Sequence, residues 1–183
     1  MGEKVGLLKE NKIPAILLAG GKSSRFGKDK SRIKINDKSL TYNQYKKLKK
    51  IFKKVYISTK KDKFDFKAPI IYDKHKVYLP IFSLINLLKK HHIIFILPVD
   101  VPMLSFKTIK KLLKEKAIIH SFLGVYTYKD LKKLKQNIKN KNYSPKINKK
   151  KIKVNQKELI NLNYKKEYLK KRYEIKKCFL SKI

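Results

Sequence analysis

Short apolar runs alternate along the chain with longer segments in which apolar residues recur every three or four positions. The runs are rich in isoleucine, leucine and valine, whereas the longer segments carry lysine between their apolar residues. A continuous apolar run predicts a strand buried on both faces, and the recurring pattern predicts an amphipathic helix. In chain order, the predicted strands cover residues 13–18, 32–36, 55–59, 69–72, 93–97, 117–119, 122–128 and 152–154.

Helices are predicted between and after these strands. They cover residues 40–52, 80–90, 105–116, 131–140 and 164–173, and a further short helix is expected to start at Ser144 and Pro145. The run at 93–97 is the most apolar, so we expect it at the centre of the sheet. Repeated alternation of strand and helix predicts an α/β fold, a three-layer α/β/α sandwich formed by one domain over residues 1–183.

The first predicted strand ends abruptly in a glycine turn. Ala19, Gly20 and Gly21 follow it directly, and residues without Cβ let the backbone turn sharply with its N–H groups aimed at a bound anion. Arg25 and Lys30 then add fixed positive charge. The spacing fits neither a Walker A loop nor a dinucleotide loop. The combination of the turn with these cations predicts a site for a nucleotide polyphosphate. The two glycines alone would indicate only a surface loop.

The charge of the chain suggests a further class of function. Its 183 residues include 49 Lys and Arg against 13 Asp and Glu, a net charge of +36, and 42% are hydrophobic. The apolar share excludes a disordered chain, while the charge suggests a nucleic-acid or membrane-surface partner. Only three of the basic residues are arginine, and the composition is typical of AT-rich coding. We therefore interpret the lysines mainly as a solvated coat that attracts anions.

Other features narrow the cellular setting and the chemistry. The sequence has no apolar run long enough to span a membrane and no apolar signal core near its start, so we expect a cytoplasmic protein. A single cysteine, Cys178, excludes an internal disulfide and a cysteine-based metal cluster. The histidines show no metal-ligand spacing and are interpreted as surface or core residues.

The segment LAGGKSSRFGKDKS, residues 18–31, carries more than a glycine turn. It resembles the signature LAGGxxxRMGxDK of the nucleotidyltransferases of the molybdenum cofactor guanylyltransferase family. Phe26 stands where that family usually has Met, which replaces one apolar residue by another. The resemblance extends over about residues 13–169. It implies a mostly parallel, Rossmann-like sheet of the nucleotide-diphospho-sugar transferase type.

Asp100 is the strongest acidic candidate. It follows the predicted strand 93–97 and lies between Pro98 and Pro102. Ligands of open α/β sheets bind outside the carboxyl ends of the strands, and Mg²⁺ is held by one or two carboxylates together with phosphate oxygens. The segment ILPVDVPML around it resembles the family's second motif, whose aspartate binds the metal. The resemblance implies that Asp100 binds Mg²⁺, contacts the nucleotide and is catalytic.

The resemblance also implies roles for the glycine turn and the cations after it. Leu18, Ala19 and Gly20 would hold the guanine base and ribose through backbone groups, and Gly21 would also bind the nucleotide. Lys30 would bind the nucleotide phosphates, and Arg25 would clamp a second phosphate or the leaving pyrophosphate. Lys30 and Arg25 are therefore expected to act in catalysis together with Asp100.

Two further nucleotide contacts come from later strands. Asp73 follows the predicted strand 69–72, where relatives have an acidic residue, and a surface turn residue is its alternative interpretation. Ser58 stands where the family often has Asn, and its hydroxyl can still form a hydrogen bond.

The segment HKVYLPIFS, residues 75–83, lacks the glycine of the family's G-P-L-x-G. The shape of the pterin-side pocket is therefore not determined by the resemblance. NLN at 161–163 resembles the family's N-x-N.

The implied activity is magnesium-dependent transfer of GMP from GTP to molybdenum-molybdopterin, with release of pyrophosphate. Its partners would be GTP, molybdopterin, the molybdenum-insertion protein and chaperones of molybdoenzymes, with no membrane and no specific nucleic acid. The residues leave open a cytidylyltransferase for the same pterin or another nucleotidyltransferase. In a different class, the charge leaves open a polyanion- or nucleic-acid-binding module.

Overall fold

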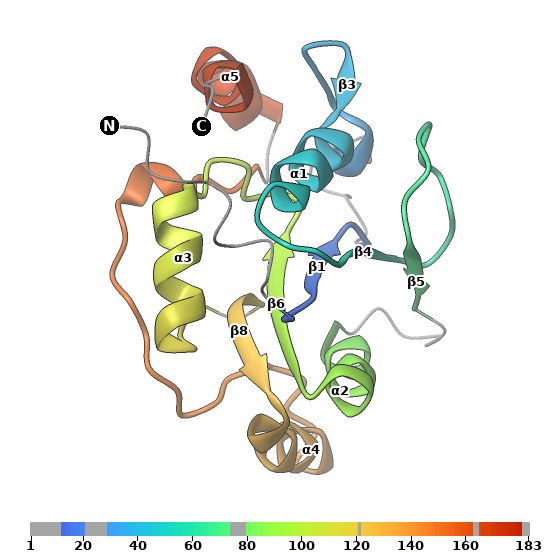
Figure 1. Ribbon diagram of the computed structural model, residues 1–183, viewed down its shortest axis with the longest axis vertical. Coiled ribbons are helices and arrows are strands. Elements are labelled where there is room, and N and C mark those ends of the chain that lie inside the picture. Colours follow the sequence, from blue (N-terminus) through green and yellow to red (C-terminus); the bar gives the residue numbers. More distant parts are fainter. Residues whose placement is uncertain (1–11, 21–28, 74–79, 121, 163–164, 181–183) are drawn as a thin grey trace.

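The computed structural model describes residues 12–20, 29–73, 80–120, 122–162 and 165–180 (Figure 1). Within these ranges a six-stranded sheet has the order β5-β4-β1-β6-β8-β7. Its strands are β1 (Ala15–Leu18), β4 (Val55–Thr59), β5 (Ile70–Tyr72), β6 (Ile93–Pro98), β7 (Ile118–His120) and β8 (Leu123–Thr127). β5, β4, β1 and β6 run parallel, whereas β8 and β7 pair antiparallel to their neighbours. The predicted strand 93–97 therefore lies at the centre, beside β1.

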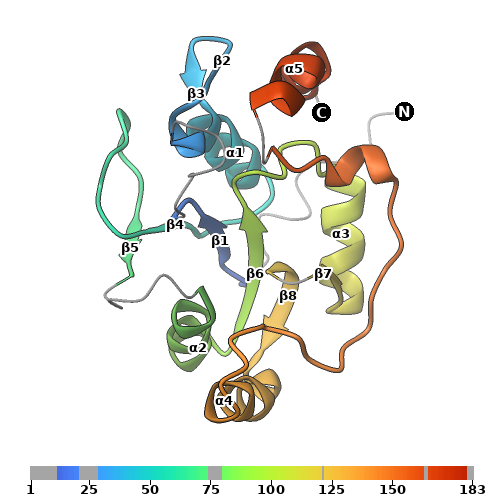
Figure 2. The same ribbon diagram turned by 180° about the vertical axis from the view of Figure 1, so that it is seen from behind.

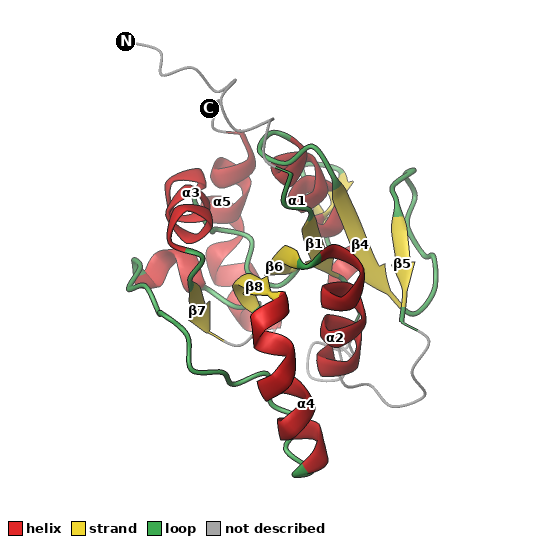
Figure 3. Ribbon diagram, turned by 60° about the horizontal axis from the view of Figure 1, so that its bottom comes forward, coloured by secondary structure: helices red, strands yellow, loops and turns green. Residues whose placement is uncertain are grey.

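Helices cover both faces of the sheet (Figure 2). The described helices are α1 (Leu40–Lys49), α2 (Pro80–His91), α3 (Phe106–Glu115), α4 (Leu131–Lys139) and α5 (Lys165–Leu180). Side chains from α1, α3 and α5 pack with one set of strand residues, and side chains from α2 and α4 pack with the other. Figure 3 shows α2 and α4 together on one side of the strands. The predicted three-layer α/β/α sandwich is confirmed.

The alternation of side chains along the buried strands supplies both cores. In β1, Leu17 belongs to the cluster under α1 and α3, whereas Ile16 belongs to the cluster under α2. Both side chains are fully buried, because a central strand of a parallel sheet faces helices on both sides. β1 and β6 therefore consist of apolar residues without a polar face.

A hairpin and short 3-10 turns complete the fold. The hairpin pairs β2 (Lys34–Ile35) with β3 (Lys38–Ser39), through Asn36 and Asp37 at φ 52° and 60°. The 3-10 turns are η3 (Lys30–Arg32), η4 (Tyr128–Asp130) and η5 (Gln156–Leu159). Ser39 caps α1, because its side chain accepts a hydrogen bond from the Tyr42 backbone N–H. The predicted strand 32–36 is thus shorter than expected and lies outside the main sheet.

Two predicted elements are wrong. No helix starts at Ser144, because the Asn137 side-chain amide donates to the carbonyls of Ser144 and Lys146 and holds this segment in an irregular path. Residues 152–154 form no strand, and the chain there makes only a bridge between Lys151 and Ile118. Among the described helices, none is both long and apolar enough to cross a membrane.

Candidate functional site

The register of the three inner parallel strands brings their carboxyl ends to one edge. Leu18, the last residue of β1, lies opposite Ser58 of β4 and Pro98 of β6. Beyond the strands, Ala19 N–H donates to Ser58 O at 2.9 Å, and Val99 N–H donates to Leu18 O at 3.0 Å. The start of the glycine turn therefore lies between the ends of β4 and β6, so that Asp100 follows on its β6 side.

A hollow opens on the other side of β1. It is a shallow hollow with about 360 Å³ of empty space, open solvent included, and its described lining comprises Leu18, Gly20, Ser58, Thr59, Lys60, Asp73 and Ser83. Asp73 is placed by its backbone N–H, which donates to Thr59 O at 2.9 Å. Four predicted nucleotide contacts, from β1, β4 and β5, thus meet in one hollow. Ala19 is buried and Asp100 does not line this hollow.

Ser83 is a residue of the hollow that the sequence reasoning missed. Its side chain is 8% exposed, and its Oγ has no hydrogen-bond partner among the residues that the structure describes. It also lines an adjoining hollow with Tyr72, Asn86 and Lys90. Burying a hydroxyl without a partner costs about 1–3 kcal/mol, and a ligand in the hollow would remove that cost. No signal in the sequence indicates it, because at helical spacing Ser83 lies away from the predicted apolar face of Ile81, Leu84, Ile85 and Leu88.

Hydrogen bonds to its backbone carbonyls hold the segment that carries Asp100. Leu162 N–H donates to Asp100 O at 3.0 Å, and Val101 N–H donates to Pro98 O at 3.3 Å. Gln44 Nε2 donates to Val101 O at 3.0 Å and more distantly, at 3.5 Å, to Val99 O. The carboxylate therefore sits on a loop whose path is defined by partners from α1 and from residue 162.

Lys47, one turn further along α1, holds the same loop. Its Nζ donates to Pro102 O at 3.1 Å, and the side chain is only 7% exposed. Burial lowers the pKa of Lys47, while Cys178 and Glu158 act in the opposite direction. The rings of Phe106 and Phe179 lie 5.9 and 5.7 Å from the ammonium. Nothing in the sequence indicates a role for Gln44 or Lys47, because polar residues on a helix ordinarily face solvent.

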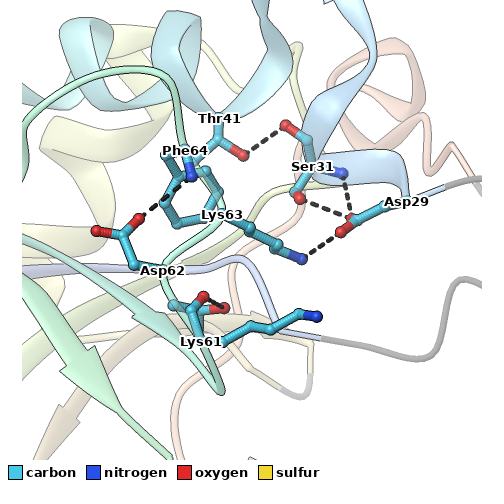
Figure 4. A network of polar contacts seen from close by, with 8 residues as sticks. Asp29, Ser31, Thr41, Lys61, Asp62, Lys63 and Phe64 are labelled. Atoms are coloured by element: carbon cyan, nitrogen blue, oxygen red, sulfur yellow. Dashed lines mark hydrogen bonds and ion pairs between the residues drawn. The ribbon is translucent and has the colours of Figure 1, made fainter.

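The motif residue Asp29 forms a network with the connection between β4 and β5 (Figure 4). Its Oδ1 accepts from Ser31 N–H and Ser31 Oγ at 3.0 and 2.6 Å, and its Oδ2 pairs with Lys63. Partial burial raises the pKa of Asp29, but the bonds from Lys63 and Ser31 outweigh it and hold the pKa below its usual value. Thr41 Oγ1 donates to Ser31 O at 2.8 Å, so α1 also holds this segment.

Three of the predicted site residues are described only in part or not at all. Gly21 and Arg25 lie outside the described residues. The backbone of Lys30 begins η3, directly after Asp29, and its side chain is outside the description. Their proposed roles therefore rest on the motif and on the position of its two ends, Gly20 and Asp29.

The possible metal ligands among the described residues suit a magnesium ion that binds together with a nucleotide. Among the residues the structure describes, no group of three or more His, Cys, Asp or Glu side chains could hold a metal ion. Mg²⁺ is usually held by one or two carboxylates plus substrate phosphates and water. A single carboxylate, Asp100, next to a glycine turn fits this type of site and not a closed structural metal centre.

A mostly parallel sheet with a glycine turn and acidic residues at its carboxyl edge defines an α/β nucleotide-binding protein. The chain belongs to the MobA-like NTP transferase family, whose domain model matches residues 15–128. The family resemblance of residues 18–31 is thereby confirmed.

Curated relatives and solved structures agree with this assignment. The chain is 39% identical over 107 residues to a molybdenum cofactor guanylyltransferase of Campylobacter jejuni, and the match covers 56% of each protein. It thus spans little more than half the length of that relative. A Helicobacter pylori protein of the same name is 35% identical over 151 residues, covering 72% of this chain and 74% of the relative.

The fold also matches the crystal structure of molybdopterin-guanine dinucleotide biosynthesis protein A from Archaeoglobus fulgidus. The TM-score is 0.72, with 19% identity, and the match covers 89% of this chain and 98% of the other. The predicted fold class is confirmed by this likeness.

Proposed function

We propose that the protein is a magnesium-dependent guanylyltransferase that transfers GMP from GTP to molybdenum-molybdopterin and releases pyrophosphate. The observation that carries the proposal is the arrangement around the end of β1. A hollow containing Leu18, Gly20, Ser58 and Asp73 lies on one side, and the Asp100 loop lies on the other. Family membership and the names of the relatives support the same activity.

In this proposal the hollow receives the nucleoside of GTP. The backbone of Leu18, Ala19 and Gly20 holds base and ribose, and Ser58 and Asp73 contribute polar side chains. The triphosphate then extends past Gly20 toward Asp100, and Gly21 is expected from the motif to contact it. Nucleotidyltransferases of this family type typically use a divalent metal. Asp100 would hold Mg²⁺, which when bound neutralises charge that develops on the phosphates.

The reaction needs no covalent enzyme intermediate. An oxygen of the terminal pterin phosphate attacks the α-phosphorus of GTP, forming a P–O bond, and the bond from that phosphorus to pyrophosphate breaks. Lys30 and Arg25 stabilise the added negative charge, Arg25 at the leaving pyrophosphate. Catalysis then consists mainly of positioning and charge neutralisation by groups that the fold holds in place.

The binding site for the pterin substrate, which accepts GMP, is proposed to lie near residues 161 and 162. Leu162 N–H binds Asp100 O, and Asn161 Oδ1 is buried without a partner among the described residues. Asn161 belongs to the NLN segment that resembles the family's N-x-N. A polar atom left unpaired beside the Asp100 loop is suited to bind the pterin substrate.

The wider assignments belong to the same proposal. The chain would act as one nucleotidyltransferase domain in the cytoplasm, with the molybdenum-insertion protein and molybdoenzyme chaperones as its partners. Its lysine coat would attract the anionic substrates without a specific nucleic-acid or membrane target.

The first experiment is a thermal-shift comparison of nucleotides in the presence of Mg²⁺. We expect GTP to raise the melting temperature more than CTP, ATP or UTP, because a ligand that binds only the folded state stabilises it. Pyrophosphate release should then require both GTP and molybdenum-molybdopterin. A larger shift and turnover with CTP would instead assign a cytidylyltransferase.

The polyanion alternative needs a separate measurement. If the protein is mainly a nucleic-acid-binding module, single-stranded DNA should bind tightly with a steep salt dependence. We expect DNA binding to vanish at physiological salt while binding of GTP with Mg²⁺ persists. DNA binding that persists while GTP binding is absent would contradict the guanylyltransferase proposal.

A further inference from the structure

We infer that helix α1 positions Asp100 for the reaction, with Gln44 and Lys47 as its positioning residues. The inference rests on the proposed function, because it gives these residues a purpose only if Asp100 serves the nucleotide and its metal. Neither side chain is a catalytic residue, since both act on the backbone of the loop that carries Asp100.

The hydrogen bonds of the Asp100 loop show how complete this hold is. Every carbonyl from Pro98 to Pro102 accepts a hydrogen bond. Val101 N–H and Leu162 N–H supply two of the donors, and the side chains of Gln44 and Lys47 supply the others, with the Cys178 thiol as a second, weaker donor to Pro102 O at 3.9 Å. A loop with all of its carbonyls engaged has little freedom to shift. Its path is set jointly by the strand end, residue 162 and α1.

The burial of these two side chains is otherwise difficult to explain. Gln44 is fully buried, and its Oε1 has no hydrogen-bond partner among the described residues. Lys47 is buried with a cation held between aromatic rings. An apolar residue would fill either place at lower energetic cost, since buried polar groups are destabilising unless they are fully bonded. The three helices α2, α3 and α4 bury mainly aliphatic residues toward the sheet.

The same face of α1 also binds the Asp29–Ser31 segment, which follows the glycine turn and ends the family motif. Thr41, three residues before Gln44, donates to Ser31 O at 2.8 Å. Ser31 is bonded in turn to Asp29, the acidic residue of the family motif. Residues three apart lie on one side of a helix, so Thr41, Gln44 and Lys47 form a polar line. One helix thus binds both the Asp29–Ser31 segment and the loop that carries Asp100.

This geometry has a kinetic consequence. A displacement of catalytic groups by about 1 Å can cost about a hundredfold in rate. Removing the Gln44 donor leaves the carbonyls of Val99 and Val101 without their side-chain partner, and removing Lys47 leaves Pro102 O only the weak Cys178 thiol. Either change should let the loop move, while the hollow on the other side of β1 keeps its lining. The effect should therefore fall on kcat and on the Mg²⁺ requirement more than on the KM for GTP.

The test compares Gln44→Met, Lys47→Met and Lys47→Arg with Lys49→Met, which removes an exposed cation from the same helix. With GTP, Mg²⁺ and molybdenum-molybdopterin, we expect Gln44→Met to lower kcat about tenfold or more and to raise the half-saturating Mg²⁺ concentration. The KM for GTP at saturating Mg²⁺ should change by less than about threefold. Lys47→Arg should recover most of the loss caused by Lys47→Met, because it keeps a donor and a charge.

Hydrogen exchange of the Val99 and Val101 amides measures the loop without turnover. These amides should exchange faster in Gln44→Met and Lys47→Met than in Lys49→Met. Gln44→Met with wild-type kcat, Mg²⁺ requirement and exchange would overturn the inference. If Gln44→Met does not fold, the same measurements on Lys47→Met and Lys47→Arg test the inference. Absence of turnover by the wild-type protein with every nucleoside triphosphate would instead overturn the proposed function, and the exchange data would still test the hold on the loop.

Discussion

Two acidic residues follow parallel strands of the same mixed sheet, Asp100 after β6 and Asp73 after β5, but the two strands occupy different positions in the sheet. β6 is an inner strand between β1 and β8, and its residues from Ile94 to Leu97 are fully buried. β5 is an edge strand beside β4, and its residues are half-buried or exposed. An inner strand has ladder partners on both sides, so its end is placed more rigidly than the end of an edge strand.

The difference separates two tasks of a nucleotidyltransferase. In the proposed reaction the metal ligand must be held to within a fraction of an ångström, and Asp100, the proposed ligand, stands on the loop that α1 and residue 162 hold. Recognition of a base tolerates adjustment, and Asp73 lies at the sheet edge beside Tyr72, whose side chain is 52% exposed. We therefore expect substitutions at the inner end to affect turnover and substitutions at the outer end to affect nucleotide choice.

The largest expected effect comes from Asp100→Ala. We expect the fold to remain intact and turnover with Mg²⁺ to fall by about three orders of magnitude, because a metal ligand stabilises transition-state charge by several kcal/mol. Steady-state kinetics and circular dichroism measure the two quantities. Asp100→Asn keeps the shape of the side chain and should lose nearly as much activity. Substantial residual turnover in both variants would remove Asp100 from the chemistry.

Asp73→Asn should have a smaller effect of a different kind. We expect kcat/KM for GTP to fall about tenfold through KM, with kcat nearly unchanged, because in the proposed complex Asp73 contacts the nucleotide in the ground state and in the transition state alike. Competition between GTP and CTP in a titration gives the change in base preference. A loss of kcat as large as that of Asp100→Ala would abolish the distinction between the two strand ends.

Ser83→Ala should change stability and binding in opposite directions. Removing a buried hydroxyl without a partner should raise the free energy of unfolding of the nucleotide-free protein by up to about 1 kcal/mol. Affinity for GTP should fall by about fivefold if the hydroxyl binds the nucleotide. Urea unfolding and calorimetric titration measure the two effects. A loss of stability with unchanged affinity would show that the hydroxyl has a structural partner instead.

The smallest effect is expected for Lys63→Met, which removes the partner of Asp29. Since the pKa of Asp29 lies below its ordinary value of 3.8, the pair stabilises the fold above that pH and ceases to do so as the pH falls through the lowered pKa. At pH 7 the loss should be under about 1 kcal/mol, because the carboxylate is partly exposed. The difference between the unfolding curves of wild type and variant should therefore be full at pH 7 and smaller at a pH well below 3.8. A difference of equal size at both pH values would contradict an electrostatic origin.

Prediction from the sequence succeeded where local patterns are strong. β4 occupies residues 55–59 as predicted, and α2 begins at Pro80 as predicted. It failed where a tertiary contact outweighs local preference, as at Ser144, whose carbonyl is bound by the Asn137 side chain. It also missed the roles of Gln44 and Lys47, because nothing in a helical pattern indicates that a polar side chain will meet the carbonyls of a loop more than fifty residues away.

The sequence by itself determined the alternation of strands and helices, the phosphate-loop motif and the acidic residue after the most apolar strand. These features depend on short-range spacing and on the requirement that apolar runs be buried. Only the tertiary structure decided the strand order, which places Leu18, Ser58 and Asp73 in one hollow with Asp100 on the far side of β1. It also decided that α1 holds the Asp100 loop, because hydrogen bonds between distant segments follow from packing and not from local pattern.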